Sequence, residues 1–127
     1  MGPIRRILLL DDCATIRAIL RVYLMNLGAE IVEAADASTA LAILRHRSVD
    51  LVIADVRMEP VDGIAFVGEI RRDESAGIRS LPVILLTSDR DETLKERGLA
   101  AGASAFVHKP VSPLALMKAI ESLGLAA

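Results

Sequence analysis

The side chains of this sequence that could do chemistry each lie directly after a short apolar run. They comprise three carboxylates, one hydroxyl and one ammonium: Asp11, Asp12, Asp55, Thr87 and Lys109. Carboxylates brought close together raise one another's pKa unless a cation lies among them. Because these ligands are oxygens, and the sequence has no His or Cys cluster, magnesium fits such a site better than zinc.

Asp55 is the candidate nucleophile of this group. A carboxylate can attack phosphorus, and aspartyl phosphates are established covalent intermediates. Phosphoryl transfer needs mainly in-line positioning, with cations or hydrogen-bond donors on the equatorial oxygens. The ammonium of Lys109 and the hydroxyl of Thr87 provide these groups. The oxygens of a modified Asp55 would then draw Thr87 and its loop inward and bias a neighbouring surface.

These residues meet only if a sheet places them at one edge. Three continuous apolar runs and two weaker ones predict five strands: residues 7–10, 51–54, 83–86, 30–33 and 104–107. Amphipathic helices are expected after each strand, so the alternation predicts an open α/β fold with a parallel sheet. Ligands of such sheets bind beyond the carboxyl ends of the strands, where all five chemical residues fall.

Several residues mark the expected ends of the helices. Gly28 and Gly102 are well placed to end the helices before them, and Ser112 followed by Pro113 is typical of a helix start. Asp62 is interpreted as a cap of the third helix. The first helix is expected to turn a stripe of side chains inward: Ile16, Ile19, Leu20, Tyr23 and Leu24.

Composition limits the classes of protein that remain. The 127 residues are 53% hydrophobic, enough for one domain with a core on both faces of a sheet. The net charge of −2 comes from interspersed acids and bases, so direct nucleic-acid contact is not expected. Cys13 is the sole cysteine, and no apolar run approaches the roughly 18 residues that span a bilayer. We therefore expect a cytoplasmic protein with no membrane contact.

In these motifs the sequence resembles the CheY-like receiver domains of response regulators, over essentially all 127 residues. The matching pieces are Asp11-Asp12, the segment 55–63, Thr87, and the segment 101–106 leading to Lys109-Pro110. The resemblance implies a doubly wound, flavodoxin-like five-stranded parallel sheet with strand order 2-1-3-4-5. It also implies a cis peptide between Lys109 and Pro110.

The resemblance further implies a site and a role in two-component signalling. Magnesium would be bound by Asp12, Asp55 and the backbone carbonyl of Arg57, with Asp11 acting through water. Asp55 would accept a phosphoryl group from a sensor histidine kinase or a histidine phosphotransfer protein. Such a domain is not an enzyme for other substrates, because it catalyses only its own phosphorylation and dephosphorylation. Residues 1–127 are expected to be the receiver alone, without an output domain.

The downstream protein target is expected to bind a surface made by the fourth helix, the fifth strand with Phe106, and the fifth helix. The fourth helix, Asp91 to Ala101, is expected to be the least stable element. Its apolar anchors are only Leu94, Leu99 and alanines, and Gly98 interrupts it.

Some positions depart from the family pattern. Glu59 stands where the family usually has proline, with Pro60 displaced by one position, and Phe106 often corresponds to tyrosine. Arg57 is expected to lean over the pocket and to meet Asp89 on the opposite lip. We hypothesise that this pair screens Asp55 from water and sets the lifetime of its phosphoryl group.

Two alternative functions stay open. A pseudo-receiver that only binds partners would normally have lost one of the key acids or the lysine. A haloacid-dehalogenase-like phosphatase, which also uses an aspartyl nucleophile, carries a general acid two residues after it, where this chain has Arg57. Simpler roles also compete: Asp12 could cap the first helix, and Cys13 is expected to be a small packed side chain.

Overall fold

The fold rests on a sheet of five parallel strands, and the computed structural model describes residues 3–88 and 92–125. The strands are β1 (Arg6–Leu10), β2 (Glu30–Ala34), β3 (Leu51–Asp55), β4 (Val83–Thr87) and β5 (Ala105–His108). Their order in the sheet is β2-β1-β3-β4-β5, as predicted from the resemblance. Every residue of the inner strands β3 and β4 is buried, which explains why their sequences are continuous apolar runs.

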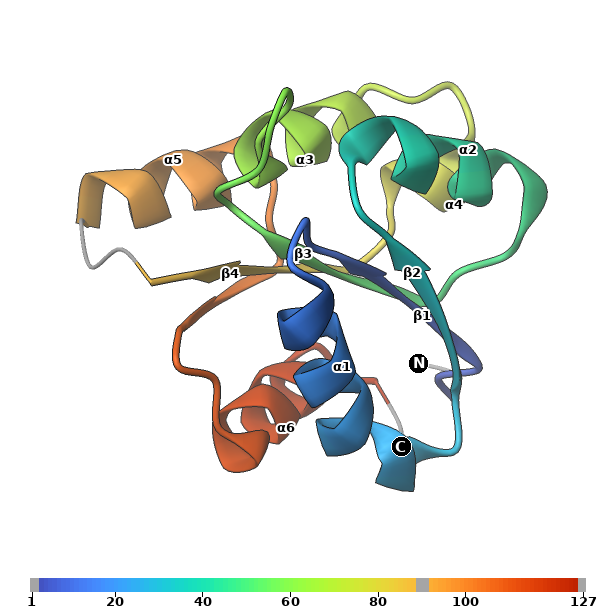
Figure 1. Ribbon diagram of the computed structural model, residues 1–127. Coiled ribbons are helices and arrows are strands. Elements are labelled where there is room, and N and C mark those ends of the chain that lie inside the picture. The colour runs from blue at the N-terminus through green and yellow to red at the C-terminus, as the bar shows by residue number, and fades with distance from the viewer. Residues whose placement is uncertain (1–2, 89–91, 126–127) are drawn as a thin grey trace.

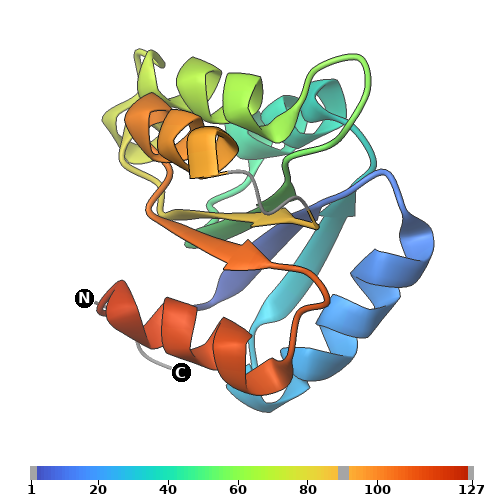
Figure 2. The same cartoon turned by 90° about the vertical axis from the view of Figure 1, so that its left-hand side faces the viewer.

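Helices cover both faces of this sheet (Figures 1 and 2). They are α1 (Ala14–Tyr23), α2 (Ala37–His46), α3 (Gly63–Arg71), the short α4 (Ala76–Arg79), α5 (Glu92–Ala101) and α6 (Pro113–Ser122), and a 3₁₀ turn, η1 (Met25–Leu27), follows α1. Helices α1 and α6 lie on one face, and α2, α3, α4 and α5 lie on the other. The sequence analysis did not predict α4.

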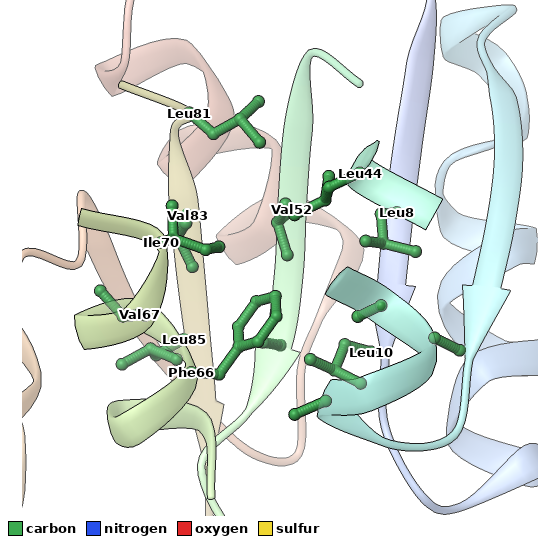
Figure 3. Close-up of a cluster of buried hydrophobic side chains, with 14 of the residues drawn as sticks. Leu8, Leu10, Leu44, Val52, Phe66, Val67, Ile70, Leu81, Val83 and Leu85 are labelled. Atoms are coloured by element: carbon green, nitrogen blue, oxygen red, sulfur yellow. The ribbon is translucent and has the colours of Figure 1, made fainter. Parts of the chain in front are cut away.

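Each face of the sheet has its own hydrophobic core. Phe66 of α3 is fully buried at the centre of one core, among leucine and valine side chains from β1, β3 and β4 (Figure 3). The other core joins Leu20 of α1 to Leu116 and Ile120 of α6 over the opposite side of the strands. Together these two cores fix the sheet between two helical layers.

The predicted starts of α3 and α6 are confirmed. Asp62 accepts a hydrogen bond from the backbone N–H of Ala65 at 2.8 Å, and Ser112 caps α6 with Pro113 in its first turn. Gly28, expected to end the first helix, instead caps the 3₁₀ turn η1, after α1 has already ended. Gly28 has a φ of 70°, a left-handed conformation that glycine adopts without strain.

Two predictions about side chains in and just before α1 are wrong. Ile19, expected to face inward from the first helix, is 40% exposed, because the inward stripe of α1 passes through its neighbours Ile16, Leu20 and Tyr23. Cys13, expected to be packed, is exposed because it lies at the N-cap of α1, on the open edge of the sheet.

Within the described residues, no helix has the length and apolar character required to cross a bilayer.

Candidate functional site

The parallel register of the strands brings the chemical side chains to one edge. Leu10 pairs with Ala54 and Asp55 pairs with Leu86, so Asp11 lies alongside Asp55 and Thr87 lies one residue further along the next strand. On the far side, the backbone N–H of Lys109 donates to the carbonyl of Thr87 at 2.7 Å. Four connections between strands and helices therefore converge at the carboxyl edge of the sheet, as the sequence predicted.

Three carboxylates form a tight group at this edge. One oxygen from each of Asp11, Asp12 and Asp55 lies within 4.8 Å of the others. Asp11 and Asp55 are buried, whereas Asp12 is exposed and faces the open side of the group. Asp12 is not the N-cap of α1, because that position is taken by Cys13, so the simpler role of helix cap does not account for it.

Lys109 is the cation that this structure places among the carboxylates. Its Nζ lies 3.4 Å from Oδ2 of Asp11 and 3.3 Å from Oδ1 of Asp55. The lysine side chain is only 18% exposed, so water weakly screens both ion pairs. The preceding X-Pro bond, Lys109–Pro110, is cis, as the resemblance implied, and Glu59–Pro60 is also cis.

The electrostatic environment favours an additional cation. Burial, and next the charge of Asp11, raise the pKa of Asp55, while Lys109 and the backbone N–H of Arg57 oppose that rise. Three carboxylates against one ammonium leave an excess of negative charge at the site. Hard oxygen donors that close to one another suit a divalent cation such as magnesium, so the residues present fit the metal that the sequence predicts.

Close packing of the backbone determines the conformation of the loop between β3 and α3. A Cβ atom at Gly63 would lie 2.3 Å from the carbonyl oxygen of Asp55, so only glycine allows α3 to begin this near the end of β3. The N–H of Gly63 donates to the carbonyl of Val56 at 2.9 Å, which closes the loop. The segment from Asp55 to Gly63 thus determines both the position of the carboxylate and the start of the helix.

A cleft of about 420 Å³ opens beside Asp12, between the β3–α3 loop and α5. Its lining includes Asp12, Arg57, Glu59, Asp62, Thr93 and Arg97. The side chain of Arg57 is exposed at this mouth. Its expected partner Asp89 lies outside the described residues, so the hypothesis of a screening pair stays a prediction.

Thr87 and Phe106 occupy the strands next to the acidic group. Thr87 is fully buried at the end of β4. Phe106 is partly buried on the face of β5 that packs under α5, with its ring 6.0 Å from that of His108. The ring of Phe106 thus lies against Gly98 of α5, on the strand next to the one that ends at Thr87.

Sequence reasoning missed Arg17, which contacts the loop that carries the acidic pair. Its Nη1 donates to the backbone carbonyl of Asp11, and its Nε donates to Oε1 of Glu33 in β2 at 2.8 Å. A partial signal was present in the sequence: Arg17 is the fourth residue of α1, and the helix dipole disfavours a basic residue in the first turn of a helix.

The fold and site together define a receiver domain of two-component signalling. The family model for the response regulator receiver domain matches residues 7–121, and the chain belongs to this family. As a family, such domains act in signalling rather than as conventional enzymes, and they bind magnesium in an acidic pocket.

Individual relatives agree with this assignment. The chain is 38% identical over 94% of its length to the "Probable transcriptional regulator ycf27" of Cyanophora paradoxa, and 33% identical over 94% to the phosphate regulon transcriptional regulatory protein PhoB of Pseudomonas aeruginosa. It covers 48% and 51% of those two proteins, so it spans about half the length of the curated relatives it matches.

Solved structures give the same result. The chemotaxis protein CheY4 of Vibrio cholerae superimposes with a TM-score of 0.85 at 30% identity, covering 94% of this chain and 98% of that one. A response regulator receiver protein from Pseudomonas putida gives a TM-score of 0.84 at 28% identity, with coverage of 96% and 99%.

Proposed function

We propose that this receiver accepts a phosphoryl group on the carboxylate of Asp55, in a magnesium-dependent reaction, from the phosphohistidine of a sensor kinase or phosphotransfer protein. The observation that carries the proposal is the meeting of three carboxylates within 4.8 Å of one another beside the ammonium of Lys109. Burying like charges without a function is costly, so a purely structural group of this kind is disfavoured.

The reaction forms one bond and breaks one bond. An oxygen of Asp55 attacks the phosphorus, the P–N bond to the donor imidazole breaks, and its electron pair returns to the imidazole nitrogen, which takes up a proton. The product is an acyl phosphate on Asp55. Lys109, 3.3 Å from Oδ1 of Asp55, neutralises one phosphoryl oxygen, and Thr87 donates a hydrogen bond to another.

Asp12, Asp55 and the backbone carbonyl of Arg57 would hold the magnesium ion, with Asp11 acting through water. When bound, the ion supplies positive charge that offsets the clustered carboxylates and the phosphoryl oxygens. Asp11 has a further task without the ion. It accepts a hydrogen bond from the N–H of Cys13 at 2.9 Å and pairs with Lys109, so it orients both the loop and the lysine.

The phosphoryl signal leaves through the surface formed by α5, β5 and α6. Thr87 ends the strand that leads into α5, and Phe106 packs beneath that helix. The curated relatives are named transcriptional regulators, so the downstream targets that we propose for this surface include a DNA-binding protein. The chain itself would work in the cytoplasm.

Intact mass spectrometry tests the phosphoacceptor. Incubation with a small acyl phosphate and magnesium is expected to add one phosphoryl group, which the variant Asp55→Asn does not gain. Asp62→Asn is the matched control, since asparagine still caps α3 and its side chain lies outside the acidic group. Modification of Asp55→Asn, or a wild-type protein that stays unmodified, would contradict the proposal.

Hydrogen exchange tests the output surface. Phosphorylation is expected to change amide protection in α5 and β5 while leaving α2 unchanged. Equal protection of α5 before and after phosphorylation would remove the basis for this surface.

A further inference from the structure

The loop between β1 and α1 carries two of the three clustered carboxylates. Hydrogen bonds of Asp11 brace this loop: the N–H of Asp11 donates to the carbonyl of Ala34 at 3.1 Å, and the side chain of Asp11 accepts from the N–H of Cys13 at 2.9 Å. The loop contains only Asp11, Asp12 and Cys13, and Cys13 gives α1 no side-chain cap. Among residues 3–88 and 92–125, the Asp12 side chain forms no hydrogen bond or ion pair. The direction of the Asp12 carboxylate therefore depends on the backbone of this loop.

Arg17 holds that backbone from the next turn of α1. Its Nη1 donates to the carbonyl oxygen of Asp11, which belongs to the peptide joining Asp11 to Asp12. Because a peptide unit is planar and rigid, holding its oxygen limits the rotation of the whole unit, which ends at the Cα of Asp12. Nothing else among the described residues donates a hydrogen bond to this oxygen.

Glu33 of β2 anchors the same guanidinium. Arg17 Nε donates to Oε1 of Glu33 at 2.8 Å, and Arg21 Nη2 lies 2.7 Å from Oε2. The Arg17 side chain is 15% exposed and that of Arg21 is 48% exposed. Both arginines thus pair with one carboxylate, but only Arg17 also contacts the acidic loop.

We propose, on the basis of the magnesium-dependent function above, that Arg17 is a positioning residue for the acidic pair. It ties the Asp11–Asp12 peptide to β2 through Glu33, so that the carboxylate of Asp12 is held facing Asp55. Arg17 contacts neither the ion nor the phosphoryl group.

The direction in which the magnesium Kd changes when Arg17 is replaced distinguishes a positioning role from simple electrostatic repulsion. A guanidinium near the site repels a cation, so removing its charge alone would strengthen magnesium binding. Loss of positioning would weaken it, and outer residues that orient metal ligands typically contribute about 10-fold or more to affinity. The two explanations therefore predict changes of the magnesium Kd in opposite directions.

Calorimetric titration with magnesium chloride alone tests the proposal on the full chain. Arg17→Met is expected to raise the magnesium Kd about 10-fold. Arg21→Met is the matched control: it removes the same charge from the same glutamate without touching Asp11, and should leave the Kd equal or slightly lower. An Arg17→Met protein that binds magnesium as well as wild type, or more tightly, would overturn the proposal.

Two further measurements distinguish positioning from lost stability. Arg17→Lys keeps the positive charge, but an ammonium cannot bridge the Asp11 carbonyl and Glu33 as the planar guanidinium does, so this variant should also bind magnesium more weakly. An unchanged magnesium Kd in Arg17→Lys would count against the proposal, even if Arg17→Met failed to fold. With acyl phosphate as donor, Arg17→Met should need more magnesium for half-maximal phosphorylation yet reach the wild-type rate at saturation. Absence of magnesium binding by the wild-type protein would instead overturn the proposed function, and this inference with it.

Discussion

Helices α5 and α6 pack on opposite faces of the same strand, β5, but they are held in different ways. Helix α6 begins at a Ser112 cap and buries Leu116 and Ile120 almost completely. In α5 the sole buried residue is Gly98, while Leu94 is only partly buried. Large buried side chains anchor α6, whereas α5 is held by the close approach of its backbone at Gly98. We therefore interpret α5 as the helix that can rearrange at the lower free-energy cost.

The largest expected effect comes from truncating one leucine in each helix. Leu116→Ala should lower the free energy of unfolding by about 2–5 kcal/mol, because Leu116 is fully buried and its truncation leaves a cavity in the core. Leu94→Ala should cost about 1 kcal/mol, since the Leu94 side chain is only partly buried. Urea denaturation measures both, and equal losses would contradict the contrast between the helices.

A β-branched residue at Gly98 tests the close approach of α5. A Cβ added at this position would lie 3.0 Å from atoms of Leu85 and Phe106, so Gly98→Val should destabilise the fold by about 1–3 kcal/mol. Ala100→Val, on the exposed side of the same helix, is the control and should cost roughly 0.5 kcal/mol. A Gly98→Val protein as stable as its control would show that α5 does not depend on this contact.

The cap of α6 provides a smaller test. Ser112 accepts from the N–H of Ala115 at 3.0 Å, so Ser112→Ala should cost about 1 kcal/mol of unfolding free energy. Ser112→Asp keeps a capping oxygen and should preserve stability in thermal unfolding. Similar losses in both variants would argue that the cap does not help to hold α6.

The smallest effect concerns an ion pair in the helical layer that contains α5 (Figure 1). Arg45 of α2 pairs with Asp73, just beyond α3, and this ion pair, followed by the N–H of Ser75, holds the pKa of Asp73 below its ordinary value of 3.8. Since the folded pKa is the lower one, the stabilisation is fully present above about pH 4 and disappears as the pH falls through the folded value.

Asp73→Asn should therefore be less stable than wild type at pH 7, and the difference should narrow as the pH falls below about 4. Thermal unfolding across pH 2–7 measures this difference. A difference that stayed constant with pH would mean that Asp73 acts through packing rather than through its charge.

Local sequence patterns predicted much of the fold and the site. Uninterrupted apolar runs gave the strands, and polar residues directly after them gave the positions of Asp11, Asp55 and Lys109 at one edge. That prediction succeeded because parallel strands necessarily end on the same side of a sheet. Short-range turn and cap chemistry likewise predicted the roles of Asp62 and Ser112.

Predictions that depended on how helices cross were less reliable. Leu99 was expected to anchor α5, but it is 43% exposed because the helix approaches the sheet through Gly98 instead. Gly98 was interpreted as an interruption of the helix, whereas it is the residue that lets α5 lie against Leu85 and Phe106. The helical repeat gives the spacing of a buried stripe, but the partner surface decides which residues lie within it.

By itself, the sequence determined the order of the five strands and of the helix after each, and the strand ends that carry the reactive groups, because both follow from periodicity and chain connectivity. Only the tertiary structure decided that Arg17 reaches the Asp11 carbonyl and Glu33, that Cys13 is exposed, and that Arg45 pairs with Asp73. Those contacts depend on how α1 and α2 sit against their neighbours. The packing of side chains distant in the chain sets that placement, which no local pattern encodes.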